Sequence, residues 1–202
     1  MRGRPAFLKK SSKKLLFVAL CAGLAGCALE TPPPSTGYLP PGAFGGAVIG
    51  EDPAMAAAND ASWVFSHPGR MQGQPAEMAM GIASLDAMAG QFSTSPRWER
   101  MNTLVKLQML QARSRVRRIL GVRPGAPSQA VIDALVAAAR ALHRGDERAA
   151  LRALSAPVFM NPPQRSLALL AHFPYVPLAN HATAFASQYL YPGGGVDQGT
   201  MD

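Results

Sequence analysis

The sequence predicts an all-α protein: a single compact bundle of six or seven helices over residues 53–191. Apolar residues there recur at intervals of three and four, the period of an amphipathic helix. Ser, Asp, Asn, Pro and Gly interrupt these stretches where helices would begin and end. No segment alternates as a half-buried strand does, and no Asn-Gly hairpin turn occurs. At 48% hydrophobic residues, a domain of about 140 residues can bury a core of its own.

The first two helices are expected over residues 53–66 and from a start near Pro75. Pro and Gly directly after His67 end the first helix. The second carries apolar residues in steps of four and three, at Met78, Ile82, Leu85, Ala89 and Phe92. Met80 and Met88 on this helix fit either an adaptable binding groove or core packing, and core packing is favoured.

A long central helix is predicted over residues 96–120, with Ser95 as its N-cap and Gly121 at its end. One apolar stripe is formed by Trp98, Met101, Val105, Met109, Ala112, Val116 and Ile119. Leu104, Leu107 and Leu110 project to a different side. Apolar residues on two sides indicate a helix that is packed between others.

Shorter helices complete the bundle, over residues 128–143, 147–156, about 163–173 and about 178–191. The cap signals are Ser128, Asp146 and Asn161. Residues 139–154 resemble one hairpin of a tetratricopeptide-like repeat. Because a solenoid needs at least three such units, we interpret this segment as a generic helical hairpin.

The N-terminus has the pattern of an export signal. Six basic residues and no acidic one precede an apolar run that begins at Leu15. This run of about a dozen residues is too short to span a bilayer. It closes on Leu24-Ala25-Gly26-Cys27, which resembles the lipobox of bacterial lipoproteins. An ordinary cleaved signal peptide is the alternative, since Gly26 and Ala28 are small.

The resemblance implies cleavage after residue 26 and a diacylglyceryl group on the Cys27 thiol, so that acyl chains hold the protein on a membrane. Residues 1–26 would be the signal peptide and residues 27–52 a Pro/Gly-rich tether that reaches about 30 to 70 Å. Residues 192–202 would form a disordered tail. Because residue 28 is Ala rather than Asp, the resemblance implies the outer membrane, facing the periplasm.

Charge and cysteine content exclude some classes of function. The formal net charge of +8 falls to +2 without residues 1–26, because 14 basic and 12 acidic residues remain. The high isoelectric point therefore reflects the export signal, and no nucleic-acid partner is expected. Cys21 is in the leader and Cys27 would be acylated, which leaves no thiol for a disulfide or a metal.

Five arginines form the strongest charge cluster after the leader: Arg113, Arg115, Arg117, Arg118 and Arg123. They predict an anion site, for a glycolipid or an acidic polymer. The alternative is that they stabilise the negative C-terminal end of the helix. Because they point in several directions around the helix axis, the alternative is favoured.

No catalytic residue, metal site or cofactor is predicted. His67, His143, His172 and His181 lie in no metal-binding motif, and no nucleotide-binding loop or nucleophile motif occurs after the leader. We therefore expect a lipid-anchored, non-enzymatic envelope protein that binds another envelope protein or organises a complex. Anion binding by the arginines and a cell-envelope enzyme are the alternatives.

Overall fold

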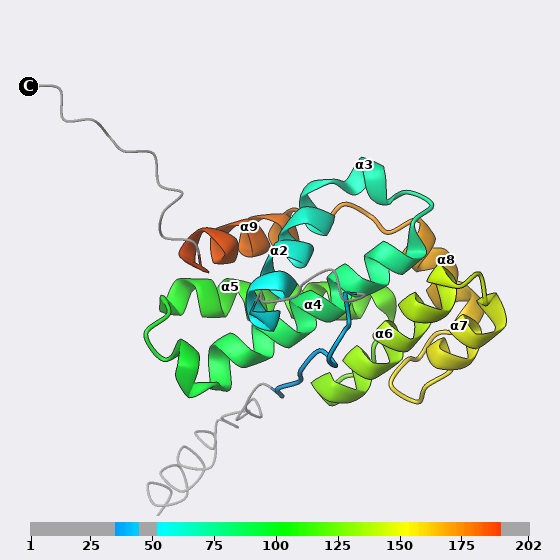
Figure 1. The fold of residues 1–202 in the computed structure, drawn as a ribbon, viewed down its shortest axis with the longest axis horizontal. Coiled ribbons are helices and arrows are strands. Elements are labelled where there is room, and N and C mark those ends of the chain that lie inside the picture. Colours follow the sequence, from blue (N-terminus) through cyan, green and yellow to red (C-terminus); the bar gives the residue numbers. More distant parts are fainter. Residues whose placement is uncertain (1–34, 45–51, 191–202) are drawn as a thin grey trace, which may run out of the picture. The chain divides into compact units, whose positions relative to one another are not determined.

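In the computed structural model, residues 35–44 and 52–190 are described, and they form a body of packed α-helices (Figure 1). The described part contains no strand, and one isolated antiparallel bridge joins Val122 to Phe159. The all-α prediction is confirmed, and each expected helix is present, with the single turn α3 in addition. The elements are α2 (Pro53–Ser66), α3 (Pro68–Met71), α4 (Pro75–Thr94), the 3-10 turn η2 (Pro96–Trp98), α5 (Thr103–Leu120), α6 (Ser128–His143), α7 (Glu147–Leu154), α8 (Pro163–Ala171) and α9 (Pro177–Leu190).

Helix α4 is the centre of the bundle, in contact with α2, α5, α6 and α8 (Figure 1). Fourteen of its 20 residues are buried, including the whole predicted stripe from Met78 to Phe92. Met80 and Met88 are buried too, so the methionines pack in the core. Gly81 lets α2 approach closely, because a Cβ atom there would lie 2.5 Å from Cγ1 of Val64.

The structure differs from the expected long central helix over residues 96–120 in two respects. First, Pro96 opens only the turn η2, and a new helix starts at Thr103 because the Asn102 side chain accepts a hydrogen bond from the Leu104 amide (2.7 Å). Second, α4 holds the central position, and α5 buries only one side. Val105 and Met109 are buried, whereas Leu104 and Leu107 are 52% and 51% exposed.

Two predicted caps have other partners. Asn161 does not cap α8; its amide nitrogen donates to the Leu120 carbonyl (2.9 Å) and so satisfies the end of α5. Ser128 is the first residue of α6 rather than its cap, and its hydroxyl bonds to residues outside the helix. Asp146 caps α7 as predicted, by accepting from the Ala149 amide (2.9 Å).

The folded body begins earlier than the sequence indicates. Residues 35–44, which we call the strap, were expected to belong to the tether, but they lie against α4 and α6 (blue in Figure 1). Gly37 is buried there, and a Cβ atom on it would lie 2.6 Å from Cδ1 of Ile132. The predicted signal peptide, Cys27 and the C-terminal tail from residue 192 lie outside the described residues.

Candidate functional site

The five predicted anion-site arginines do not form one surface. Arg113 is buried, and its Nη1 donates to the Ser35 carbonyl (2.9 Å) and to the Ser128 hydroxyl (3.2 Å). Burial lowers the pKa of Arg113, the neighbouring Arg117 adds to this effect, and the charge of Asp86 opposes it. Arg113 therefore acts as a structural link between α5, α6 and the strap.

Arg117 also points inward. Its Nε and Nη2 donate to the two carboxylate oxygens of Asp86 at 2.6 and 2.7 Å, and its Nη1 donates to the Ala126 carbonyl (2.8 Å). The Asp86 side chain is 1% exposed. A buried carboxylate needs a cation and hydrogen bonds, and Arg117 supplies both. A sequence signal for the Asp86–Arg117 pair does exist: Asp86 is an acidic residue within the largely apolar sequence of α4.

The remaining three arginines, Arg115, Arg118 and Arg123, are exposed. Arg118 lies in the last turn of α5, where a cation stabilises the helix end. The Arg123 Nε donates to the Pro157 carbonyl (3.2 Å). Of the five arginines, only these three could therefore meet an external anion, because Arg113 and Arg117 are engaged inside the body.

The strap is attached by hydrogen bonds along its length. The Gln129 side chain accepts from the Tyr38 amide (2.9 Å) and donates to the Tyr38 carbonyl (3.0 Å). Gln91 donates to the Gly37 carbonyl (3.1 Å). Ser35 bonds to Ser128 through its hydroxyl and its carbonyl, both at 3.0 Å. No periodicity marks these residues, so the sequence analysis missed them.

An apolar face lies where α5 begins and α9 ends. We define it by Leu104 and Leu107, one helical turn apart on α5, and Tyr189 of α9. The Asn102 amide donates to the Tyr189 hydroxyl (3.0 Å), which places the Tyr189 ring beside the start of α5. All three side chains are at least 45% exposed. The α5–α9 face is thus a group of large apolar residues that the fold leaves in contact with water.

A pocket of about 470 Å³ opens between α2, α4, the end of α6 and the strap. We call it the Asp60 pocket. Its lining combines apolar residues, of which Met80 is buried, with charged groups of both signs. Its lining consists of strap residues 42–44 with Asp60, Glu77, Met80, Arg140, His143 and Arg144. The volume is typical of sites for small ligands.

Asp60 is the unusual group of this pocket. It accepts a hydrogen bond from the Ser84 hydroxyl (2.7 Å) and makes no ion pair with the described residues. Burial raises the pKa of Asp60 to about 6; the Ser84 hydrogen bond opposes the rise and the charge of Glu77 adds to it. A carboxyl group with a raised pKa beside a pocket is a feature of functional sites.

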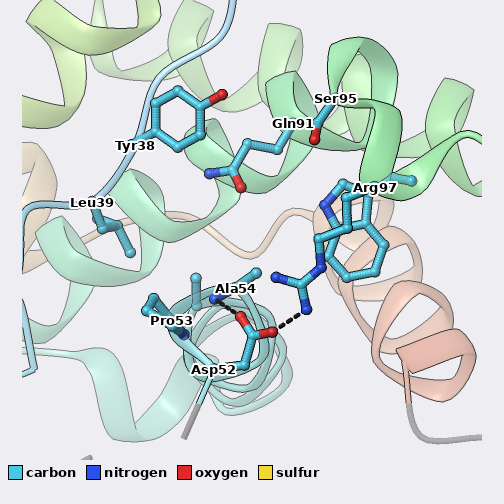
Figure 2. Close-up of a pocket in the computed structure, with 10 residues that line it drawn as sticks. Tyr38, Leu39, Asp52, Pro53, Ala54, Gln91, Ser95 and Arg97 are labelled. Carbon is cyan, nitrogen blue, oxygen red and sulfur yellow. Dashed lines mark hydrogen bonds and ion pairs between the residues drawn. The ribbon is translucent and has the colours of Figure 1, made fainter.

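A second, smaller pocket of about 260 Å³ lies between the strap, α2 and η2 (Figure 2). Its charged groups are already paired, as Figure 2 shows for Asp52 and Arg97. The Arg97 guanidinium also lies 4.5 Å from the centre of the Trp98 ring. The Arg97 hydrogen bond lowers the pKa of Asp52 against the effect of burial. This pocket offers an incoming ligand no unpaired charge.

The histidines fall at separate places. His67 follows α2 and stacks on Trp63, and His143 ends α6 with its Nε2 3.7 Å from a carboxylate oxygen of Glu77. His172 follows α8, and His181 is exposed on α9. Over residues 35–44 and 52–190, no three His, Cys, Asp or Glu side chains are placed to hold a metal ion together.

The chain matches no known family model, no curated protein and no solved structure. Among the described helices, none combines the length and the apolar character needed to cross a membrane. The α5–α9 face and the Asp60 pocket must therefore be interpreted from their own chemistry.

Proposed function

We propose that this protein is a lipid-anchored component of the bacterial cell envelope, and that its helical body binds another envelope protein through the α5–α9 face. The single observation that supports the binding role is the exposure of Leu104 and Leu107. The sequence pattern places both leucines as if they were to be buried, yet no described element covers them. Large apolar side chains grouped at a surface are typical of interaction sites.

The attachment of the strap to the helical body implies that a lipid-anchored protein would hold this body close to its membrane. If Cys27 carries the lipid, only eight peptide steps separate it from Ser35, where attachment to α6 begins. Eight steps span at most about 28 Å. A partner would therefore be one that is itself close to the membrane surface. This reach is shorter than a tether over residues 27–52 would allow.

The partner is tested by cross-linking in cells. A photoreactive residue in place of Leu107 is expected to capture one reproducible envelope protein, and the same residue at Ala137, exposed on α6, is the matched control. The Leu104→Gln/Leu107→Gln variant should remain folded, since both side chains are exposed, and should lose the complex. Equal capture at both positions, or a complex that survives the double substitution, argues against the proposal.

The anchor is tested separately. The Cys27→Ala variant is expected to lose labelling by radioactive palmitate and to leave the membrane fraction. The Cys21→Ala variant, changed six residues upstream in the predicted leader, should keep both properties. A Cys27→Ala protein that is still labelled and membrane-bound would refute the lipobox interpretation.

A further inference from the structure

We infer that the Asp60 pocket binds a small amphoteric ligand, one that carries an ammonium group and a carboxylate on a short apolar chain, such as a free amino acid. The residues that line the pocket do not include Leu104, Leu107 or Tyr189, which define the α5–α9 face. The inference therefore rests neither on the partner nor on the lipid anchor.

The ammonium half of the site is Asp60. Its carboxylate is partly buried, accepts a hydrogen bond from the Ser84 hydroxyl, and forms no ion pair with a described residue. Glu77 adds a second negative charge nearby. A desolvated carboxylate without a counter-charge is unfavourable, and an incoming ammonium group relieves that cost. The group that fits beside Asp60 is thus a cation that donates hydrogen bonds.

The carboxylate half of the site is the C-terminal end of α6. Arg140 and Arg144 both line the pocket, and neither forms an ion pair with a described residue. Within the described residues, Arg140 makes one long hydrogen bond, from its Nη2 to the Pro41 carbonyl (3.4 Å). Both guanidinium groups therefore have donors free to bind a carboxylate.

The lining of the pocket also includes apolar side chains. Met80 of α4 and Phe44 of the strap line it together with the acidic and the basic residues. A ligand with one charge would satisfy one side and leave the other unpaired. A ligand with both charges and an apolar middle pairs with both, and leaves the net charge of the pocket unchanged.

The probes are the ω-amino acids from glycine to 6-aminohexanoate, titrated into the purified full-length protein and followed by ligand-observed NMR. Each is compared with the alkylamine and the alkanoate of the same chain length. At least one ω-amino acid should bind about ten-fold more tightly than either of its comparators, the loss expected from removing one charge-assisted hydrogen bond. If no member of the series does so, the inference is overturned.

Two variants test which residues bind the ammonium group and which bind the carboxylate of the ligand. Asp60→Asn should weaken binding of the best probe about ten-fold and abolish its advantage over the alkanoate, and Arg140→Gln should do the same relative to the alkylamine. Glu99→Gln and Arg152→Gln change exposed residues outside the pocket and should leave binding unchanged. Slow hydrogen exchange of the Tyr38 amide verifies that the strap of Arg140→Gln is still attached. Unchanged binding in Asp60→Asn overturns the inference, whatever the cross-linking and palmitate experiments show.

Discussion

Arg117 of α5 donates hydrogen bonds to both carboxylate oxygens of Asp86, a residue buried in the middle of α4. The same guanidinium donates to the Ser128 hydroxyl (2.8 Å), which in turn bonds to Ser35 of the strap. One buried polar network thus joins the central helix, two of its neighbours and the N-terminal segment. Such a network specifies how elements assemble, because any other arrangement leaves a charge buried without a partner.

Removing one partner of this pair should destabilise the protein strongly. We expect Arg117→Met to lower the free energy of unfolding by about 3–5 kcal/mol, because the Asp86 carboxylate stays buried without its cation. Urea denaturation measures the change. Arg118→Gln, the exposed neighbour in the last turn of α5, should shift it by less than about 0.5 kcal/mol. The Asp86→Asn/Arg117→Met protein should be more stable than Arg117→Met alone. If the two substitutions prove simply additive, the pair is not coupled as described.

The strap should detach when Gly37 gains a side chain. In Gly37→Ala the new methyl group would meet Cδ1 of Ile132 at 2.6 Å and the backbone nitrogen of Gln129 at 2.9 Å. We expect faster hydrogen exchange at the Tyr38 amide, with a helical body that remains folded. Gly69→Ala is the matched control, because nothing lies within 4 Å of a Cβ atom there. A Tyr38 amide as protected as in the unaltered protein would contradict the close packing of Gly37.

Asp60 should make stability depend on pH. Its folded pKa of about 6 is above the ordinary value of 3.8, so the folded state holds the proton more tightly than the unfolded state. Stability therefore falls as pH rises from about 4 to 6, by up to about 3 kcal/mol. The Asp60→Asn variant should lack this contribution and be more stable than the unaltered protein at pH 7.5.

Denaturation of both proteins between pH 4 and 7.5 measures the difference. Glu77, Arg140, His143 and Arg144 also face the pocket and are unchanged in the variant, so the difference between the two curves reports Asp60. Glu99→Gln, an exposed acid elsewhere, is the control. Curves for Asp60→Asn and the unaltered protein that run parallel over this range would refute the raised pKa.

The crossing of α2 and α4 should not tolerate a larger residue at position 81. In Gly81→Ala the added Cβ atom would lie 2.5–2.8 Å from three side-chain atoms of Val64, which we expect to cost about 1–3 kcal/mol. Combining it with Val64→Gly removes those atoms. The double variant should be at least about 1 kcal/mol more stable than the sum of the single changes predicts. Thermal or urea denaturation decides this, and strict additivity would disprove the contact.

Helix positions were largely predictable, because each helix carries its own apolar period and its own stop signals. The expected helix over residues 53–66 has the bounds observed for α2. Helix α5 ends at Gly121 as expected, and the structure shows this residue in a left-handed conformation (φ 77°). The break at residues 99–102 was not predictable in the same way. Ser95-Pro96 is an equally good start signal, and only the structure shows that Asn102 provides the cap instead.

Burial at the candidate sites was harder to predict than helix position. Leu104 and Leu107 have the spacing of core residues, yet they are exposed because no described element packs over that side of α5. Arg113 and Arg117 have the spacing of a surface cluster, yet they point inward because Asp86 and the strap require their donors. Asp60, Glu77 and Arg140 come from three helices, so no local pattern could bring them together.

The local features of the protein could be predicted from the chain alone: the all-α class, the order and most of the ends of the helices, and the motif around Cys27. These depend on periodicity and caps, which act over a few residues. The packing of the helices, rather than any local pattern, fixes which helix is central, which arginines are internal, and the place of residues 35–44 in the body. Those outcomes depend on contacts between residues up to about a hundred positions apart, such as Ser35 with Ser128 and Arg140 with Pro41. Such contacts leave no period in the chain, because each needs only one suitable partner at one place in the fold.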